Sequence, residues 1–403
     1  MRTVVCVKWV PVMSQLRFDP ETKRLAREGV PGEPSSFDVR ALLGALALRD
    51  EHGGEVVVVT MGPAAATEGL RECLALGADR AVLLSDRALA GSDTLATARA
   101  LAAFVRREQP DLVLLGKASG DAETGQVGPE LAELLDLPQA TSVRRITLNP
   151  GGRWFDVERE TDDGTETLRG SLPAVLTAGE DLAPERFPNK AQRQAALDKP
   201  LVTLSLADVG LVPSDVGADG SPTWVEGVET VPSTRAGEML AGDTPEALAV
   251  ALRARLTALG ALTRGGDDRQ PLTTRLARPG APLWVVVEAS EGRVRSVTGE
   301  LLAKAHELAG QLGGMVEAVV LGDDEAQALA LAAAGADRIL VARDPGLAPY
   351  TTEAHAAVLV AAIRARQPRL VLFGSTSQGR DLAPRVAARL GLGLTGDAVD
   401  LDL

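Results

Sequence analysis

Continuous hydrophobic runs alternate with stretches of helical length along most of the chain. The first run, residues 3–10, is apolar without interruption, which is typical of a strand buried on both faces. Strands that alternate with helices predict an α/β fold with a mostly parallel, doubly wound sheet. In the first part of the chain we expect strands at residues 3–10, 55–60, 80–84 and 111–115, and helices at 38–51 with Asp38 as N-cap, at 64–76, at 93–108 and from about Pro129.

The chain repeats its own pattern. Residues 109–121 read QPDLVLLGKASGD and residues 367–379 read QPRLVLFGSTSQG; two further pairs of matching blocks precede them, in the same order and 258 to 260 residues apart. Repeats of solenoid proteins have periods of roughly 20–50 residues, so this spacing indicates two copies of a whole domain. In the second copy we expect strands at 283–288, 315–321, 338–341 and 370–373, and helices at 297–312, 323–334, 351–366 and 381–390.

The segment between the copies has a different character. Polar–apolar alternation around a DDG turn at residues 153–178 predicts a small antiparallel excursion that returns to the sheet. Residues 179–235 are rich in Pro, Asp and Gly and suggest an extended arm, residues 244–260 a short helix, and the following stretch a flexible linker. The predicted units are a nucleotide-binding domain (1–200), an arm with a short helix (201–260), a linker (261–281) and a second domain (282–403).

Composition narrows the functional classes. A net charge of −13 argues against nucleic-acid binding, which needs a surplus of Lys and Arg. No apolar run approaches the roughly 18–20 residues of a membrane span, and the N-terminus has the pattern of a strand rather than a signal peptide. Cys6 and Cys73 lie far apart in apolar surroundings, so we expect buried thiols and a reducing cytoplasm.

The strongest candidate for a binding site is the glycine-rich loop at residues 116–128. Ligands of open parallel sheets bind beyond the carboxyl ends of the strands, and the helix that follows this loop favours an anion such as a nucleotide phosphate. A glycine-rich turn without a ligand is the alternative, and no GxxxxGK[ST] motif is present. The matching segment 374–381 of the second copy is also rich in Gly, Ser and Thr; Arg380 could meet a phosphate or an acidic partner there, but a solvated turn is the simpler interpretation.

Residues for catalysis are scarce. His52, His306 and His355 fall on predicted helices, where we expect surface positions. No Ser/His/Asp order, HExxH or CxxC pattern occurs. Any chemistry in which this protein takes part must therefore come from a bound cofactor.

The segment VERETDDGTETLRGSLPAVLTA (157–178) closely resembles the signature of the electron-transfer flavoprotein beta subunit, in which Arg159, Asp162, Asp163, Glu166 and residues 173–177 fall at the family spacing. This resemblance covers about residues 1–260. Residues 282–403, with LAAAGADRILVAR and GRDLAPRVAARLGLGLTGD, resemble the N-terminal domain of the alpha subunit. The chain is therefore similar to a beta subunit fused to the first domain of alpha.

The resemblance implies two homologous doubly wound, mostly parallel sheets of the adenine-nucleotide alpha-hydrolase-like type. It implies an electron carrier rather than an enzyme, which receives electrons from flavin-dependent dehydrogenases and passes them to a quinone reductase or similar acceptor. The first domain would bind AMP or, as in electron-bifurcating members, FAD. The residues implied for that site are Cys6, Met61, Gly116, Lys117, Ser119, Asp121, Thr124, Gly125, Gln126, Val127 and Gly128.

The sequence also departs from the family. Ala122 and Glu123 replace the usual Gly-Asp, whereas the VGPE run at 127–130 resembles bifurcating-type beta subunits. Residues 184–200 lack the usual pattern of the arm that recognises dehydrogenases. The last residues, GDAVDLDL, have the pattern of a beginning strand, so we expect either that a separate polypeptide supplies the C-terminal alpha domain with the redox FAD or that the sequence is a fragment. A bifurcating-type flavoprotein and a non-redox adenine-nucleotide-binding scaffold are the alternatives.

Overall fold

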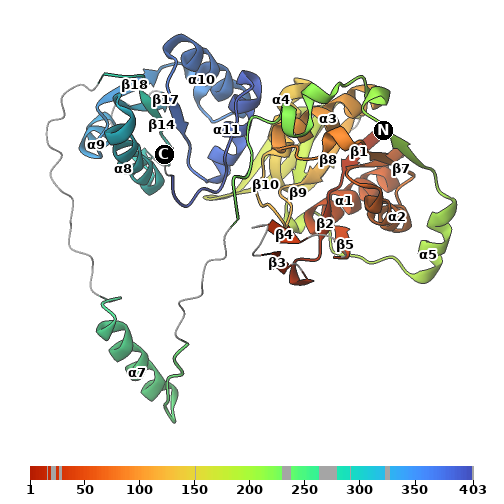
Figure 1. Cartoon of the computed structure of the whole chain (residues 1–403), viewed down its shortest axis with the longest axis horizontal. Coiled ribbons are helices and arrows are strands. Elements are labelled where there is room, and N and C mark those ends of the chain that lie inside the picture. The colour runs from red at the N-terminus through yellow and green to blue at the C-terminus, as the bar shows by residue number, and fades with distance from the viewer. Residues whose placement is uncertain are drawn as a thin grey trace.

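The first half of the protein is built on a nine-stranded sheet (Figure 1). The computed structural model describes residues 1–15, 17–19, 24–26, 30–149, 151–228, 237–262, 279–290, 292–322 and 327–401. Across the sheet the strands lie in the order β11 (Gly164–Ser171), β10 (Trp154–Thr161), β9 (Gln139–Leu148), β12 (Ala174–Ala178), β8 (Leu112–Gly116), β1 (Arg2–Cys6), β6 (Glu55–Met61), β7 (Arg80–Leu84) and β13 (Leu201–Leu204). The pairs from β9 to β13 in this order are parallel, and the β9–β10 and β10–β11 pairs are antiparallel.

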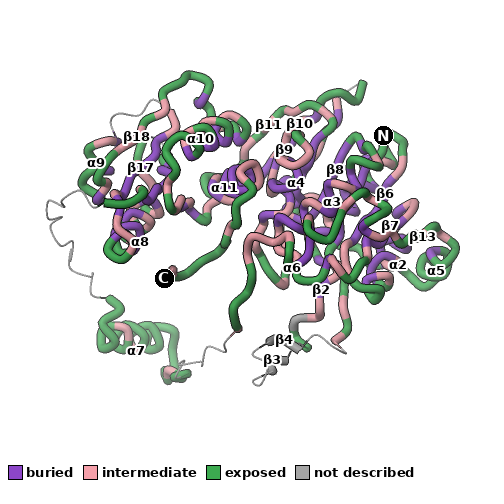
Figure 2. Tube along the Cα trace, turned by 45° about the horizontal axis from the view of Figure 1, so that its top comes forward, coloured by how far each residue is buried: buried purple, intermediate pink, exposed green. Residues whose placement is uncertain are grey.

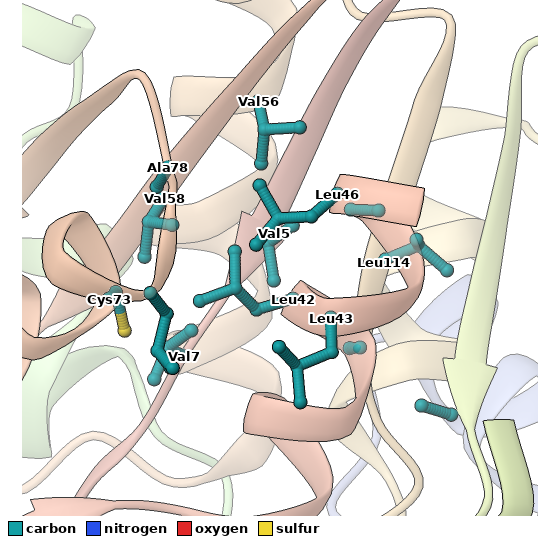
Figure 3. Close-up of a cluster of buried hydrophobic side chains, with 14 of the residues drawn as sticks. Val5, Val7, Leu42, Leu43, Leu46, Val56, Val58, Cys73, Ala78 and Leu114 are labelled. Carbon is teal, nitrogen blue, oxygen red and sulfur yellow. The ribbon is translucent and has the colours of Figure 1, made fainter. Parts of the chain in front are cut away.

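The two faces of this sheet bury alternate residues of the same strands. Val5 of β1 packs with Leu42 of α1 and with Cys73 of α2, in the cluster that Figure 3 shows. Val4 points to the opposite face and packs with Phe104 of α3. Because both faces are covered, the strands are apolar throughout, and the predicted doubly wound α/β architecture is confirmed. The covering helices are α1 (Ser36–His52) and α2 (Thr67–Leu76) on one face, and α3 (Thr94–Glu108) and α4 (Val127–Leu135) on the other.

The expected antiparallel excursion is the hairpin of β10 and β11, which lengthens one edge of the sheet. At the opposite edge β13 pairs with β7, although the sequence predicts an extended arm from residue 201. Leu206 and Val216 are also buried, against α3 and the segment after β7. The stretch beyond residue 200 therefore contributes an edge strand and a small core, although Val202 and Val212 remain exposed.

The second half repeats the design on a smaller scale. Its four-stranded parallel sheet has the order β18 (Arg338–Ala342), β17 (Val316–Leu321), β14 (Leu283–Val286) and β19 (Leu370–Leu372). Leu283 and Val285 face α8, whereas Trp284 and Val286 face the other two long helices. The helices are α8 (Ser296–Leu312), α9 (Ala328–Ala333), α10 (Thr352–Arg366) and α11 (Ser377–Leu390).

Smaller elements complete the described residues. Three short antiparallel pairs are β2 (Trp9–Pro11) with β5 (Gly32–Pro34), β3 (Arg17–Asp19) with β4 (Arg24–Ala26), and β15 (Ala289–Ser290) with β16 (Arg293–Val294). The remaining helices are α5 (Lys190–Ala195), α6 (Gly217–Gly220) and α7 (Pro245–Ala258). Figure 2 shows α7 as mostly exposed, and none of its residues is buried. Most of the predicted linker, residues 263–278, lies outside the described residues. Within the described parts, no helix is long and apolar enough to cross a membrane.

Three local expectations differ from the structure. Helix α1 begins at Ser36, so Asp38 is not its N-cap but a buried residue of its first turn. His306 and His355 are buried rather than exposed, because α8 and α10 turn these positions toward the protein interior; His355 Nδ1 lies 3.0 Å from the Thr351 carbonyl oxygen. Residues 391–401, which include most of the predicted final strand, form no strand.

Candidate functional site

The candidate site lies at the carboxyl edge of the nine-stranded sheet. Strands β1, β6 and β8 end there side by side, because they are parallel neighbours. Strand β8 ends at Gly116 and the loop after it leads into α4 at Val127. The predicted residues of this loop are therefore next to the ends of the two strands that carry Cys6 and Met61.

A buried carboxylate holds this edge together. Asp38 accepts hydrogen bonds from the backbone N–H of Gly116 at 2.6 Å and from that of Lys8 at 2.8 Å. Burial raises the pKa of Asp38 to about 7, although these two donors favour the charged form. A Cβ on Gly116 would lie 2.7 Å from the Asp38 carboxylate, so only glycine fits at the end of β8. Sequence reasoning missed this role because it treated Asp38 as a local helix cap.

A second carboxylate fixes the loop itself. The Lys8 ammonium lies 2.7 Å from Asp121 and 3.2 Å from the Ser119 hydroxyl. Burial opposes ionisation of Asp121, but the hydrogen bonds from Lys8 and Ser119 outweigh it and leave the pKa below its ordinary value. The segment after β1 is thus tied to the loop, and Lys8 becomes a site residue that the sequence did not single out.

The glycines of the loop serve different purposes. Gly125 has a φ of +65°, and a Cβ there would lie 3.3 Å from the Lys117 carbonyl oxygen, so its backbone conformation itself requires glycine. A Cβ on Gly128 would lie 2.4 Å from the Thr177 side chain, so that glycine allows α4 to approach β12. Only Gly120 faces open space. Two of the predicted ligand glycines, Gly116 and Gly128, are therefore already explained by packing.

The side chains of Cys6 and Met61 contribute to the core. Cys6 is a free thiol in the cluster under α3 and α4, and burial beside Asp38 raises its pKa. Met61 is half-buried against the same cluster. The expectation that both cysteines are buried and unpaired is confirmed.

Several buried polar atoms near this edge have no hydrogen-bond partner among the described residues. They are Ser35 Oγ before α1, Thr60 Oγ1 near the end of β6, and Glu130 Oε2 in the first turn of α4. Buried polar groups are normally paired, so such atoms fit a site that takes a polar ligand. With the backbone of Gly125 and the N-terminus of α4, they are compatible with an adenine nucleotide. No group of three or more His, Cys, Asp or Glu side chains suited to a metal ion occurs in the described part of the chain.

The same loop also borders a cavity of about 320 Å³ shared with the second domain. Lys117 and Gly125 line it from the first domain, with Thr141, Ser142 and Thr177. From the second domain it is lined by Ser375, Thr376, Ser377 and Arg380. The carboxyl edges of the two sheets therefore face one another.

The segment 374–381, at the carboxyl edge of the second sheet, is therefore not a solvated turn, although the sequence suggests one. The Arg380 guanidinium donates to the Glu123 carbonyl oxygen at 3.1 Å and pairs with Asp397. The N–H of Ser377, at the start of α11, donates to Asp162 at 2.8 Å. The second copy uses the edge that would hold a ligand to bind the first copy, and Arg380 meets an acidic partner within its own chain.

The centre of this contact is an ion pair between the two domains. Arg159 of β10 donates to Asp381 of α11 at 2.7 Å, and these residues are only 4% and 1% exposed. Asp381 also accepts from Thr141 at 2.7 Å and from Gln139 at 3.1 Å. The carboxylate is thus surrounded by donors, as a buried charge requires.

The remaining signature residues surround this ion pair. Glu166 accepts from Arg159 at 2.8 Å, and Asp163 pairs with Arg295 of the second domain. Further along the interface Glu133 of α4 accepts from both Arg385 and Arg389 of α11. The signature is visible in the sequence as a motif, but nothing in the sequence indicates that its residues contact the second domain, 132 to 222 positions away.

The comparison with known families agrees with this picture. The model of the electron transfer flavoprotein domain matches residues 22–209 and again residues 283–403. The chain therefore belongs to the electron transfer flavoprotein domain family, and two separate regions of it match.

Individual relatives align with the first part of the chain. The protein is 42% identical over 249 residues to the electron transfer flavoprotein subunit beta of Thermoanaerobacterium thermosaccharolyticum, which covers 62% of this chain and 95% of the relative. It is 40% identical over 258 residues to CarD, a subunit of the caffeyl-CoA reductase-Etf complex of Acetobacterium woodii; the alignment covers 64% of this chain and 98% of CarD. It is 45% identical over 243 residues to protein FixA of Azorhizobium caulinodans; the alignment covers 59% of this chain and 86% of FixA. The chain is an electron transfer flavoprotein beta-like protein in its first part.

Proposed function

We propose that this chain is an electron-carrier component in which a beta-type domain and the equivalent of the first alpha domain form one base. The observation that carries the proposal is the buried pair of Arg159 and Asp381. It joins the beta signature of the first matching region to α11 of the second. Two family domains that dock through such a contact in one polypeptide correspond to a fused beta–alpha base, on which a flavin-bearing domain would work.

The first domain of this base would hold an adenine nucleotide at its carboxyl edge. The phosphate and ribose would be bound by the backbone of Gly125, the N-terminus of α4 and the hydroxyls of Ser119 and Thr124. Asp121 would be held in place beside them by Lys8. The backbone at Cys6 and Met61 would border the base. Glycine at position 125 supports this assignment, because the backbone can approach a ligand closely there.

The nucleotide would be AMP or FAD. FAD, when bound, supplies one- and two-electron chemistry, whereas AMP would only stabilise the fold. The similarity to CarD, a subunit of a caffeyl-CoA reductase complex, and the VGPE run at 127–130 favour FAD as a second candidate. A non-redox scaffold that binds an adenine nucleotide is the third possibility.

The partners follow from this role. Flavin-dependent dehydrogenases would donate electrons, and a quinone reductase or similar acceptor would receive them. The dominant negative charge, −13, is consistent with protein partners rather than nucleic acid, and we place the protein in the cytoplasm.

The test is to purify the protein without added cofactor, record its visible spectrum, and identify the nucleotide that acid denaturation releases. AMP from a colourless protein would support a structural nucleotide, and FAD from a yellow protein would support the bifurcating-type candidate. Protein without any nucleotide, which also fails to bind added AMP or FAD in calorimetry, would refute the site.

A further inference from the structure

The two sheets of the protein correspond strand by strand up to one edge. In the first sheet β8, β1, β6 and β7 lie side by side, and in the second β19, β14, β17 and β18 lie in the same order. The first sheet continues beyond β8 with β12, β9 and the hairpin of β10 and β11. Among the described residues the second sheet stops at β19, so the edge of β19 that faces away from β14 is unpaired there.

Burial of the corresponding side chains differs at this edge. Residues 112–114 of β8 are fully buried. The repeat aligns them with residues 370–372 of β19, of which the first two are only half-buried. The two strands have nearly the same sequence, so the difference comes from their neighbours. The neighbour that β8 has and β19 lacks is β12, which pairs with β8 along its whole length.

The backbone of β19 is also available for pairing. Arg369 donates its N–H to the Pro282 carbonyl oxygen, before β14, at 2.9 Å. Successive residues of a strand direct their N–H groups to opposite sides, so those of Leu370 and Leu372 point away from β14. Unpaired N–H and C=O groups along an edge strand are a template for another strand.

The segment 391–401 corresponds to the beginning of β9. The C-cap residues of α4 and α11, Asp136 and Gly391, both have left-handed backbone conformations. Six residues further on, Ser142 and Asp397 again have positive φ, of 52° and 56°. Such a φ is uncommon for a residue other than glycine, so the two segments share a specific backbone path. Because β9 pairs with β12 and not with β8, the segment 391–401 lacks the neighbour that makes its counterpart a strand.

This segment lies against the same face of the second sheet as β19. Leu401 and Leu370 both pack against the apolar cluster under α8, and Asp400 pairs with Lys304 of that helix at 2.7 Å. Residues 391–400 are otherwise exposed except for Leu394 (Figure 2). The segment therefore stays near β19 without pairing with it among the described residues.

We propose that the free edge of β19 is an interaction surface that takes one parallel strand of a partner polypeptide. This strand would occupy the place that β12 has in the first sheet, and the segment 391–401 would close over its other side as β9 does. All five residues of β12 are buried, so the strand that fits is short and apolar. Its fourth residue would carry a hydroxyl, because Thr177 Oγ1 accepts from the N–H of Ser142 at 3.0 Å and Asp397 offers the equivalent N–H. The proposal rests on the sheets alone and depends neither on a nucleotide nor on an electron-carrier role.

The experiment adds the peptide SLPAVLTAG, which copies residues 171–179, to the intact protein and measures hydrogen exchange at single amides. We expect the amides of Leu370 and Leu372 to exchange roughly five- to tenfold more slowly when the peptide is bound, about the effect of one hydrogen bond. The Asp397 amide should also slow down. The amides of Leu112 and Leu114 are the matched control: β12 already covers their edge, so their exchange should not change.

Two altered peptides make the result specific. Leu176→Pro in the peptide removes an N–H from a strand that must pair on both sides, so the protection of β19 should be lost. Thr177→Val in the peptide removes only the hydroxyl. With it, Leu370 and Leu372 should remain protected, whereas the Asp397 amide should exchange as fast as in the free protein.

Three results would overturn the proposal. The first is unchanged exchange of Leu370 and Leu372 at peptide concentrations up to about 1 mM, the range of weak specific binding. The second is equal protection by the proline peptide, which would show that the effect is not strand pairing. The third is slow exchange of both amides without any peptide: in a sedimenting dimer it would assign the edge to a second copy of the chain, and in a monomer to the chain itself.

Discussion

Replacing Asp381 by alanine should undock the two domains while leaving each of them folded. The substitution removes the buried partner of Arg159, which stays against Thr141 with only the half-exposed Glu166 as counter-charge. Burial disfavours the Arg159 cation, and Asp381 is the largest influence that restores its raised pKa. Breaking a buried ion pair from one side costs about 3–5 kcal/mol.

This cost falls on the docking equilibrium rather than on either core. Neither residue is part of an apolar cluster within one domain, so the helices and sheets should persist. At about 1.4 kcal/mol for each factor of ten, the docked fraction relative to the undocked one should fall roughly a hundred- to several-thousand-fold. The measurement is hydrogen exchange of β9 and α11 peptides, together with the radius of gyration from small-angle scattering.

Two further variants make the prediction specific. The double variant Arg159→Met with Asp381→Leu replaces the pair by apolar groups and should regain most of the docking, because apolar replacement of a buried pair is often neutral. Asp156→Asn breaks an ion pair with Arg169 on the same hairpin, but that pair is exposed, so docking should not change. Unchanged exchange and scattering in Asp381→Ala would refute the interface; an equal effect of Asp156→Asn would show that any charge on the hairpin suffices.

Three other outcomes are expected. Gly125→Val should lose the nucleotide while circular dichroism stays unchanged, whereas Gly120→Ala, which faces open space, should retain it; nucleotide kept by the valine variant would exclude the loop. Gly69→Ala places a Cβ 2.4 Å from the Trp9 ring and should lower the free energy of unfolding by about 1–3 kcal/mol, with a red shift of Trp fluorescence; an unshifted spectrum would contradict this. The pKa of Asp121 is lowered in the folded state, so its stabilising contribution is present above the unfolded pKa of about 4 and is lost as pH falls through the folded pKa. In Asp121→Asn, the melting temperature should therefore fall less steeply as the solution is acidified. An unchanged dependence of melting temperature on acid pH would argue against the Lys8 contact.

Much of the fold follows from local patterns. Buried parallel strands are apolar on both faces, so a run such as residues 55–60 is enough to predict a strand. The repeat shows that the same pattern of strands and helices occurs twice. The hairpin at 153–178 is equally visible from its alternation. Strand β13 could not be predicted in this way, because an edge strand of four residues with two exposed side chains has almost no hydrophobic pattern.

The candidate site also contains residues that the sequence indicates and residues that only the structure reveals. The glycine-rich loop could be found from its composition, but Lys8 and Asp38 act through contacts to residues that are distant in sequence. No local signal distinguishes a buried Asp38 from a helix cap. The pairing of Arg159 with Asp381 spans 222 positions, so the resemblance identifies the signature without saying what it binds.

The covalent connection between β13 and β14 has a consequence for how the domains associate. In two separate chains, docking would depend on protein concentration; within one chain it is unimolecular, and the 78 residues between Leu204 and Leu283 give an effective concentration below the roughly 1 mM of a short linker. At an effective concentration on the order of 0.1 mM, an interface with an intrinsic Kd of about 0.01 mM would be docked about ten to one. The polar contacts around Asp381 can therefore be weak by the standards of a permanent heterodimer and still hold the base together at any dilution.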